Sequence, residues 1–420
     1  MSKNIIEPKI LKGTRDFLPL TQVRRNFVIN KIREVFERYG YDPIETPILS
    51  YAETLLGKYG DEGDKLTYNF DDRGGRRIAL PYDLTVPTAR YVAANWQELA
   101  IPFKRYQIQR VWRAEKPQKG RLREFYQCDI DVIGTRSLVA DVEIAKVTVA
   151  IFEALGFKKF TVKVNSRRLM NEILKSLGFE GNPTAIITTI DKMDKIGKEG
   201  VTAELKEKGI ADDKIEALFK AFDDKDFSAY DNSEIDEFMR LCGAFSIDKN
   251  RIEFDPYLAR GLDYYTGMIY EVVSEDVDLG CSMAGGGRYD DLCSIFSKQD
   301  FPGVGISFGF ERIMLALEQM GVLDGIGLSA QVLVTRFSEE SADDSLSTLN
   351  ALIEGGIKAE VYFEAAKLSK QFKYADKKNT PFVVTRGPEE IENNQITVKN
   401  MQSGEQTTIP FDELVSYIKG

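Results

Sequence analysis

A change of hydrophobic pattern near residues 321–328 divides this chain into two parts. The stretch GVLDGIGL is rich in glycine, which is typical of a linker. After it, strand-like and helix-like segments alternate: strands at 331–337, 357–363 and 381–387, helices at 339–354 and 365–378, and a hairpin at 396–410. This alternation predicts a separate small α/β domain over residues 329–420.

The longer part before the linker combines helices with strands. Apolar residues at helical spacing predict an amphipathic helix over 21–39, whose buried face comprises Val23, Phe27, Ile32, Val35, Phe36 and Tyr39. Two strands at 105–113 and 123–133, joined by a polar loop, predict a hairpin. The other expected elements are an extended segment at 43–50, helices at 139–155 and 311–320, a mostly helical insertion at 170–248, and strands within 251–273 and 303–310.

The composition is that of a soluble globular protein. The chain has 420 residues, of which 43% are hydrophobic and 29% charged, enough for two or three domains. No apolar stretch is long enough to span a bilayer, and the N-terminal segment MSKNIIEPKI lacks the apolar core of a signal peptide. We therefore expect a cytoplasmic protein without a membrane partner.

The absence of histidine excludes several mechanisms. With no histidine in the chain, a Ser-His-Asp triad, a histidine general base and a histidine-ligated metal are ruled out. The four cysteines, which are far apart and form no CxxC pair, indicate reduced core thiols, and we expect no protein-ligated structural metal. Catalysis must depend on arginine, lysine, carboxylates, backbone groups or bound ions. The cysteines are Cys128, Cys242, Cys281 and Cys293.

The hairpin at 105–133 carries a dense group of polar side chains. Because alternate residues of a strand share a face, Gln127, Asp129 and Asp131 lie opposite an apolar row. Arg113 and Glu115 also share a face, and the loop between the strands is basic. A half-solvated antiparallel sheet and a site whose loop reaches over polyphosphate both fit this pattern, and the spacing alone leaves both open.

Three shorter segments offer further candidates. LARGLDYYTG, at 258–267, by itself predicts a strand with a turn, and in it Arg260 precedes a carboxylate and two tyrosines. GGGRYD, at 285–290, predicts either a tight turn or a close approach of the backbone to a ligand. GVGISFGFER, at 303–312, places Arg312 in the first turn of a helix, where its charge opposes the helix dipole. That position favours a ligand-facing role over a surface arginine.

A row of lysines marks the C-terminal domain. These residues share one face of the helix at 365–378, and a solvated face and a surface that tracks phosphates both fit the spacing. The net charge of −10 argues against indiscriminate binding of nucleic acid but allows a local basic patch. The lysines are Lys367, Lys370, Lys373 and Lys377.

Taken together, these segments resemble the histidyl-tRNA synthetases, a class II aminoacyl-tRNA synthetase family, over nearly the whole chain. KGTRDFLP looks like the family's N-terminal signature, and LARGLDYYTG and AGGGRYDDL like the two segments of the histidine-specific branch. GYDPIETPIL, VWRAEKPQKGRLREFYQCDID and GISFGFERI are similar to class II motifs 1, 2 and 3. The resemblance implies an α+β fold, with a class II synthetase-type antiparallel sheet flanked by helices, a helical insertion and a C-terminal α/β anticodon-binding domain.

The resemblance also implies a division into domains. Residues 1–169 would form the first part of the catalytic domain, with motifs 1 and 2. Residues 170–248 would be the mostly helical insertion, and 249–325 the second part of the catalytic domain, with the histidine-specific segments and motif 3. Residues 329–420 would bind the anticodon.

Roles for single residues follow from the matching positions. Arg113 and Arg260 would hold the α-phosphate of ATP and stabilise charge in the transition state. Glu115 would meet the adenine amino group, while Arg121 and Arg312 would clamp the outer phosphates or stack on adenine. The implied histidine-binding residues are Asp83, Leu84 and Thr85 for the α-amino group, Gln127 for the amino acid, and Asp131, Tyr264 and Tyr265 for the imidazole.

The implied activity is the ATP-dependent joining of L-histidine to the 3′ end of tRNA(His), with Mg²⁺ accompanying ATP and the enzyme acting as a homodimer. A competing interpretation is a non-catalytic paralogue that serves as a histidine-sensing regulatory subunit of histidine biosynthesis. Such proteins typically lack the anticodon-binding domain and some ATP-handling residues. Here Arg113, Arg260, Arg312 and the segment 329–420 are all present, which favours the enzyme.

Overall fold

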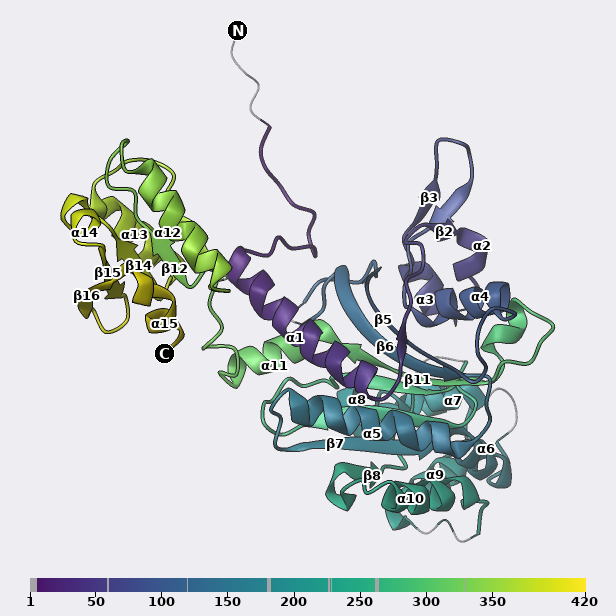
Figure 1. Ribbon diagram of the computed structural model, residues 1–420. Helices are drawn as coiled ribbons and strands as arrows, with labels where there is room; N and C mark the ends of the chain where they lie inside the picture. The colour runs from purple at the N-terminus through teal and green to yellow at the C-terminus, as the bar shows by residue number, and fades with distance from the viewer. Residues whose placement is uncertain are drawn as a thin grey trace. The chain divides into compact units, whose positions relative to one another are not determined.

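The computed structural model describes residues 6–58, 60–118, 120–179, 183–225, 227, 229–260, 264–328 and 330–420 (Figure 1). They belong to two compact units, and the boundary between them at Val322 and Leu323 falls inside the glycine-rich stretch. The first unit runs to Asp16 and from Val28 to Val322, and the second comprises Phe17–Phe27 and Leu323–Gly420. Helix α1 (Pro19–Arg38) contributes residues to both.

An eight-stranded sheet forms the centre of the first unit. Its strands lie in the order β1-β5-β6-β11-β10-β9-β7-β8, and neighbours are antiparallel except for the β1–β5 and β7–β8 pairs at its two edges. The predicted hairpin is confirmed as β5 and β6. The strands are β1 (Asp42–Pro43), β5 (Phe103–Trp112), β6 (Glu124–Ile133), β7 (Phe160–Ser166), β8 (Ile252–Phe254), β9 (Met268–Ser274), β10 (Ala284–Arg288) and β11 (Gly303–Gly309).

The two faces of this sheet have different neighbours. Helix α5 (Leu138–Ala154) lies along one face (Figure 1). On that face the ring of Phe308 is 5.9 Å from the ring of Phe36 in α1 and 6.3 Å from the ring of Phe152 in α5, measured between centroids. Phe308 is opposite Cys128 in the β6–β11 register. The side chains of alternate parity, including those of Gln127, Asp129 and Asp131, therefore point away from these helices.

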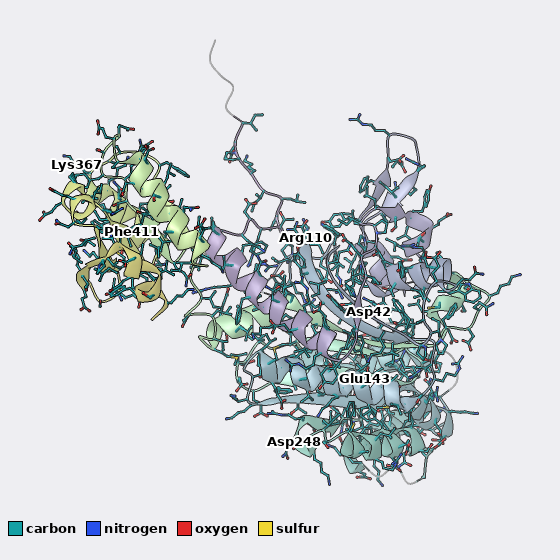
Figure 2. All side chains as sticks on the ribbon, viewed as in Figure 1. Asp42, Arg110, Glu143, Asp248, Lys367 and Phe411 are labelled. Atoms are coloured by element: carbon teal, nitrogen blue, oxygen red, sulfur yellow. The ribbon has the colours of Figure 1, made fainter. Side chains whose placement is uncertain are left out.

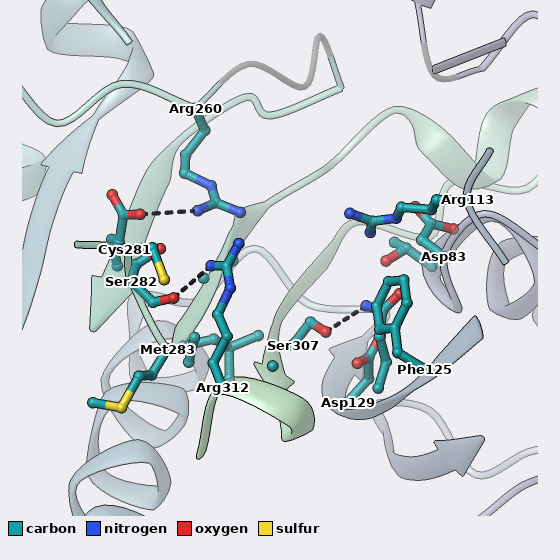
Figure 3. Close-up of a pocket in the computed structure, with 18 of the residues that line it drawn as sticks. Asp83, Arg113, Phe125, Asp129, Arg260, Cys281, Ser282, Met283, Ser307 and Arg312 are labelled. Carbon is teal, nitrogen blue, oxygen red and sulfur yellow. Dashed lines mark hydrogen bonds and ion pairs between the residues drawn. The ribbon is translucent and has the colours of Figure 1, made fainter. Parts of the chain in front are cut away.

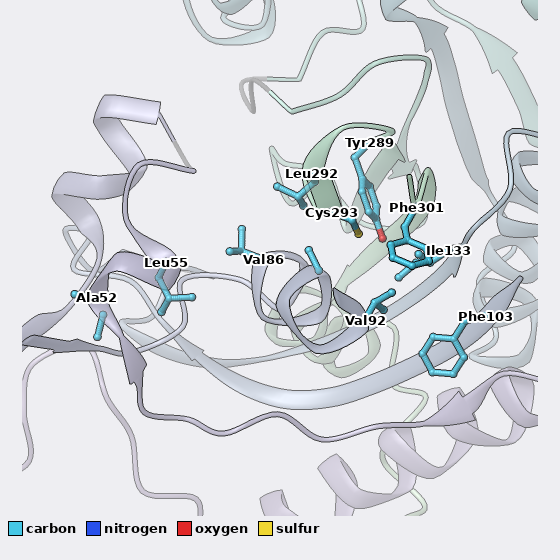
Figure 4. Close-up of a cluster of buried hydrophobic side chains, with 12 residues drawn as sticks. Ala52, Leu55, Val86, Val92, Phe103, Ile133, Tyr289, Leu292, Cys293 and Phe301 are labelled. Carbon is cyan, nitrogen blue, oxygen red and sulfur yellow. The ribbon is translucent and has the colours of Figure 1, made fainter. Parts of the chain in front are cut away.

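Residues 50–95 form a smaller layer that packs against the large sheet. A buried apolar cluster holds this layer together, and it includes Leu55, Val86 and Phe103 (Figure 4). Close packing of such side chains provides much of the favourable free energy of folding. Its elements are β2 (Ser50–Tyr51), α2 (Ala52–Leu55), α3 (Gly60–Leu66), β3 (Asn69–Asp71), β4 (Arg77–Ala79) and α4 (Thr85–Asn95).

The segment predicted as mostly helical is helical. Its amphipathic helices bury apolar residues such as Ile187, Leu205, Leu218 and Phe238, and α10 packs against α5. The helices are α6 (Arg167–Ser176), α7 (Pro183–Ile190), α8 (Met193–Glu207), α9 (Asp212–Asp224) and α10 (Ser233–Ala244); α11 (Phe310–Gln319) follows β11 later in the chain. No helix of the described residues is long and apolar enough to cross a membrane.

The second unit contains the predicted strand and helix alternation. Its five-stranded sheet has the order β13-β12-β14-β15-β16, with β12 parallel to β13 and β14 and the last two pairs antiparallel. Val332, Leu352 and Val384 lie in its core. The elements are β12 (Val332–Val334), α12 (Ala342–Glu354), β13 (Ala359–Val361), α13 (Leu368–Lys378), β14 (Phe382–Thr385), α14 (Pro388–Glu392), β15 (Gln395–Asn400), β16 (Gln406–Pro410) and α15 (Leu414–Lys419). The predicted α+β class is confirmed.

Three local predictions need correction. Phe27, expected on the buried face of the first helix, is 39% exposed, and Val28 is buried instead. GGGRYD begins within strand β10 and forms no tight turn; a Cβ atom at Gly286 would lie 2.1 Å from the carbonyl oxygen of Gly305, so only glycine lets the two backbones approach. In LARGLDYYTG the described residues form no strand, and residues 261–263 lie outside the described part.

A buried ion pair ties α5 to β10, and we expect its loss to destabilise the first unit. The guanidinium of Arg288 pairs with the carboxylate of Asp141, to which the hydroxyl of Tyr270 also donates, and both charged side chains are at most 1% exposed. Asp141→Ala should lower the free energy of unfolding by about 3 kcal/mol, because it removes the closer of the two carboxylates that neutralise the buried Arg288 charge and leaves only Asp290, at 3.2 Å. Guanidinium-induced unfolding measures the loss. Glu34→Ala, at an exposed pair with Lys31, is the control and should unfold like the unmodified protein; similar midpoints for both variants would contradict the expectation.

Candidate active site

A pocket of about 490 Å³ lies on the face of the large sheet that points away from α5 (Figure 3). Strands β6, β9, β10 and β11 contribute to its lining, together with the segment before α4, the β5–β6 loop and the start of α11. Residues far apart in the sequence therefore meet in one cavity. The predicted residues that line it are Asp83, Thr85, Arg113, Glu115, Arg121, Gln127, Asp131, Arg260, Tyr264, Tyr265 and Arg312.

Leu84 does not line the pocket. Its side chain is fully buried beneath the start of α4, so only its backbone could take part in a site formed with its neighbours Asp83 and Thr85. Asp83 is fixed at this helix start because its carboxylate accepts a hydrogen bond from the N–H of Val86 at 3.1 Å.

Asp131 is enclosed by its neighbours. Its carboxylate makes an ion pair with the guanidinium of Arg105 in β5 and accepts a hydrogen bond from the hydroxyl of Tyr289. Gly305 stands opposite it in β11, and a Cβ atom there would lie 2.0 Å from the Asp131 carboxylate. The glycine in β11 therefore makes room for the aspartate in β6.

Asp129 lies on the same face of β6, with Gln107 opposite it in β5 and Ser307 opposite it in β11. Its side chain is buried and lines the pocket. Burial raises the pKa of Asp129 to about 7; the positive charge of Arg105 acts against this rise, while the negative charges of Asp131 and Asp83 add to it.

Two tyrosines close this part of the pocket. The rings of Tyr264 and Tyr265 are 4.8 Å apart between centroids. Burial raises the pKa of Tyr264 well above its ordinary value, and repulsion from the negative charge that Tyr265 would carry when ionised adds to the rise; burial also raises the pKa of Tyr265. Both hydroxyls are therefore protonated at neutral pH and are able to donate hydrogen bonds to a ligand.

Three guanidinium groups point into the cavity from different sides (Figure 3). Arg113 is held by a 3.0 Å hydrogen bond from its Nε to the carbonyl oxygen of Tyr82, and its guanidinium lies 4.3 Å from the centroid of the Tyr82 ring. Arg260 is 3.6 Å from the carboxylate of Glu271 in β9. A Cβ atom at Gly285 would lie 2.2 Å from the Arg260 guanidinium, so the first glycine of GGGRYD makes room for this arginine.

Arg312 is the third of these arginines and lies in the first turn of α11. Its guanidinium donates a 2.5 Å hydrogen bond to the carbonyl oxygen of Ser282. Burial lowers its pKa, and the positive charges of Arg121 and Arg113 lower it further. Like charges gathered in this way are costly unless an anion binds between them, so the arrangement suits a polyphosphate.

The structure adds pocket residues to which the sequence analysis gave no role. Cys281, predicted as a core thiol, is exposed and lines the pocket, whereas the other three cysteines are buried as predicted. Asp191 and Lys195 reach the pocket from the helical segment, and Glu271 from β9. Asp129 was the one detectable in advance, because it shares strand parity with Gln127 and Asp131. The positions of the others depend on chain segments that meet only in the folded protein.

The predicted lysine row lies in the second unit. Lys370, Lys373 and Lys377 are exposed along α13, and Lys367, also exposed, immediately precedes the helix (Figure 2). Lys370 is 3.6 Å from Glu364, but both side chains are more than 60% exposed, so this contact is weak. The neighbouring Lys378 differs, because it pairs with Glu360 at 2.6 Å.

Comparison with known proteins agrees with the fold. The family model for histidyl-tRNA synthetase matches residues 13–313, and that for an anticodon-binding domain matches residues 331–420. A histidine–tRNA ligase from Christiangramia forsetii is 40% identical, with the match covering 98% of this chain and 99% of that protein; one from Phocaeicola vulgatus is 39% identical with the same coverage. The crystal structure of histidyl-tRNA synthetase from Nostoc sp. PCC 7120 matches with a TM-score of 0.85 and 31% identity, covering 99% of each chain.

The antiparallel sheet, the pocket on its open face and the C-terminal α/β unit are those of a class II aminoacyl-tRNA synthetase. Within that class, the chain belongs to the histidyl-tRNA synthetase family.

The exposure of Cys281 leads to a chemical test of the pocket. Iodoacetamide at pH 8 should modify Cys281 before the other cysteines, because the thiolate is the reacting form and burial raises the pKa of Cys242 and Cys293 to about 12. ATP should slow this modification, since Cys281 shares the pocket with Arg312. Peptide mass spectrometry with and without ATP measures both effects, and Cys281→Ser is the control. A modification rate that ATP leaves unchanged would place the nucleotide elsewhere.

Proposed function

We propose that the chain is a histidine–tRNA ligase, which activates L-histidine with ATP and transfers it to the 3′ end of tRNA(His). The observation that supports this most directly is the convergence of Arg113 and Arg260 in one pocket, beside the buried carboxylates of Asp83 and Asp131. The two arginines suit a polyphosphate. The two carboxylates suit a small zwitterion with a polar side chain.

The first step needs no protein base. The histidine carboxylate is already ionised, so it attacks the α-phosphate of ATP directly and releases pyrophosphate. The work of the site is positioning and charge neutralisation, for which guanidinium groups are well suited. This agrees with a chain that contains no histidine.

The arginines divide this work. Arg113 and Arg260 hold the α-phosphate and stabilise the charge that develops on it. Arg121 and Arg312 clamp the outer phosphates or stack on adenine. Glu115, which lies 3.6 Å from Arg121, accepts from the adenine amino group.

The amino acid lies beside Asp83. That carboxylate and Thr85 bind the α-ammonium group, with Leu84 supplying backbone only, and Gln127 contacts the amino acid through its amide. Asp131, Tyr264 and Tyr265 define the imidazole pocket. A site that hydrogen-bonds a polar side chain rejects analogues lacking it, because its own buried groups would be left unpaired.

Magnesium would accompany ATP. The described residues contain no cluster of three carboxylate, cysteine or histidine side chains that could hold a metal ion. Mg²⁺ is usually bound through substrate phosphates and one or two protein carboxylates, and Glu271, which lines the pocket, is a carboxylate that could contact it. When bound, it would neutralise charge on the departing pyrophosphate.

The second step, transfer of histidine to tRNA(His), also involves the parts of the chain that bind tRNA. Residues 1–169 and 249–325 form the catalytic domain, 170–248 the insertion, and 329–420 the anticodon-binding domain, whose lysine row (Lys367, Lys370, Lys373 and Lys377) contacts tRNA phosphates. The enzyme works in the cytoplasm as a homodimer. The regulatory-subunit alternative is disfavoured, because the anticodon-binding domain is present and relatives at about 40% identity over the full length are named histidine–tRNA ligases.

Removal of Arg260 should test the chemistry of the first step. We expect Arg260→Ala to lower kcat for histidine-dependent ATP–pyrophosphate exchange by about 100-fold or more with little change in KM, because the lost interaction is strongest in the transition state. Arg110→Ala, on the same sheet and half exposed beside Glu124, is the matched control and should keep full activity. A change in KM alone would show that Arg260 does not contact the reacting phosphate.

Removal of the lysine row should separate tRNA binding from amino-acid activation. Lys370→Ala combined with Lys373→Ala should raise KM for tRNA several-fold while leaving pyrophosphate exchange unchanged, because each lysine neutralises a phosphate. The KM for tRNA should rise with salt concentration more steeply in the unmodified protein than in the double variant, which has lost two phosphate contacts, so the difference between the two proteins should shrink as salt increases. Lys358→Ala combined with Lys419→Ala, exposed elsewhere in the same unit, is the control. Equal KM values for the two double variants would show that the lysine row is a solvated face that does not bind tRNA.

A further inference from the structure

The deep part of the pocket contains more negative than positive charge. Asp83, Asp129 and Asp131 are each at most 4% exposed. The charged groups that act most strongly on Asp129 are one cation, Arg105, and two anions, Asp131 and Asp83. A buried charge without a counter-charge is costly, so this arrangement favours a ligand that brings positive charge.

The three carboxylates differ in what they already bind. One oxygen of Asp131 accepts the hydrogen bond from Tyr289, and the other pairs with Arg105. Asp83 caps the start of α4. Asp129 is hydrogen-bonded by the side chain of Ser307, and its Oδ1 is buried and has no hydrogen-bond partner among the described residues. Asp129 also lines the cavity (Figure 3).

We propose that Asp129 is a further specificity-determining residue, which binds the imidazole of the substrate histidine as an ion pair and lies beside Asp131 in the imidazole pocket. The proposal rests on the proposed function above. Histidine then brings two positive groups into the pocket, an α-ammonium for Asp83 and an imidazolium for Asp129. The pocket selects histidine because its side chain both donates a hydrogen bond and accepts a proton near neutral pH.

The Asp129–imidazole pair contains one proton, whichever partner carries it. Burial raises the pKa of free Asp129 to about 7, and that of a free imidazole is about 6.5. Above pH 7 both free partners have lost their protons, so histidine binding takes one up and the Kd rises as pH increases, approaching about tenfold per pH unit. Around Asp129 the facing groups are Arg105 and Gln107 on β5, Asp131 on β6, Ser307 on β11 and Asp83 before α4.

The test uses Asp129→Asn in the full-length protein, with histidine binding measured by calorimetry from pH 6.5 to 8.5. At pH 7 we expect the Kd of the variant to be at least about tenfold higher than that of the unmodified protein, a loss typical of a charged hydrogen bond. The ratio of the two Kd values should fall toward pH 8.5, because only the unmodified site depends on proton uptake. A Kd within about twofold of the unmodified value, or a ratio that does not change with pH, would overturn the proposal.

Two control variants separate recognition from structure. Asp129→Asn should keep the unmodified Tm, since it removes a buried charge, whereas Asp131→Asn should lower Tm because Arg105 loses its ion pair. Asp300→Asn, at a side chain 65% exposed, should bind histidine like the unmodified protein.

If Asp129→Asn does not fold, the unmodified protein alone decides. Calorimetry of histidine binding at pH 8 in two buffers of different ionisation enthalpy should give an uptake approaching about one proton, and an uptake near zero overturns the proposal. Failure of the proposed function is distinct: the unmodified protein would then show no histidine-dependent pyrophosphate exchange.

Discussion

The pairing of β6 with β11 is the constraint on which the site depends. Because side chains alternate across a strand, this register puts Phe308 and Cys128 against α1 and α5, and puts Asp129 and Asp131 opposite Ser307 and Gly305 on the open face. A shift of one residue would turn the carboxylates into the helix-packed core and the aromatic ring into the pocket. The apolar packing that stabilises the sheet therefore also fixes the direction of the charged groups.

Glycines give the charged side chains the space they need. At Gly305 and Gly285 a Cβ atom would collide with Asp131 and Arg260, and at Gly286 it would collide with the backbone of β11. The glycine-rich strand β10 thus serves close packing and ligand access together. Glycine makes a strand less stable than β-branched residues do, so β10 loses some stability in making this room.

A chain without histidine carries out its chemistry with guanidinium groups and carboxylates. The arginines provide fixed positive charge at every physiological pH, which suits phosphate transfer. The protonation of the buried carboxylates responds to their environment. Burial raises the pKa of Asp129 to about 7. Because the chain contains no histidine, the only imidazole in the active site is that of the substrate.

Local patterns in the sequence were enough to predict most of the helices and strands and the polar face of β6. Strand parity separated Gln127, Asp129 and Asp131 from the apolar row, and hydrophobic periodicity gave α5, the helical segment and the alternation of the second unit, because these patterns are local. Tertiary structure decided the rest. The predicted hairpin placed the strands of Arg105 and Asp131 side by side, but only the register of the folded sheet paired these two residues. The exposure of Cys281 in the pocket and the strand formed by GGGRYD depend on neighbouring strands that no local pattern identifies.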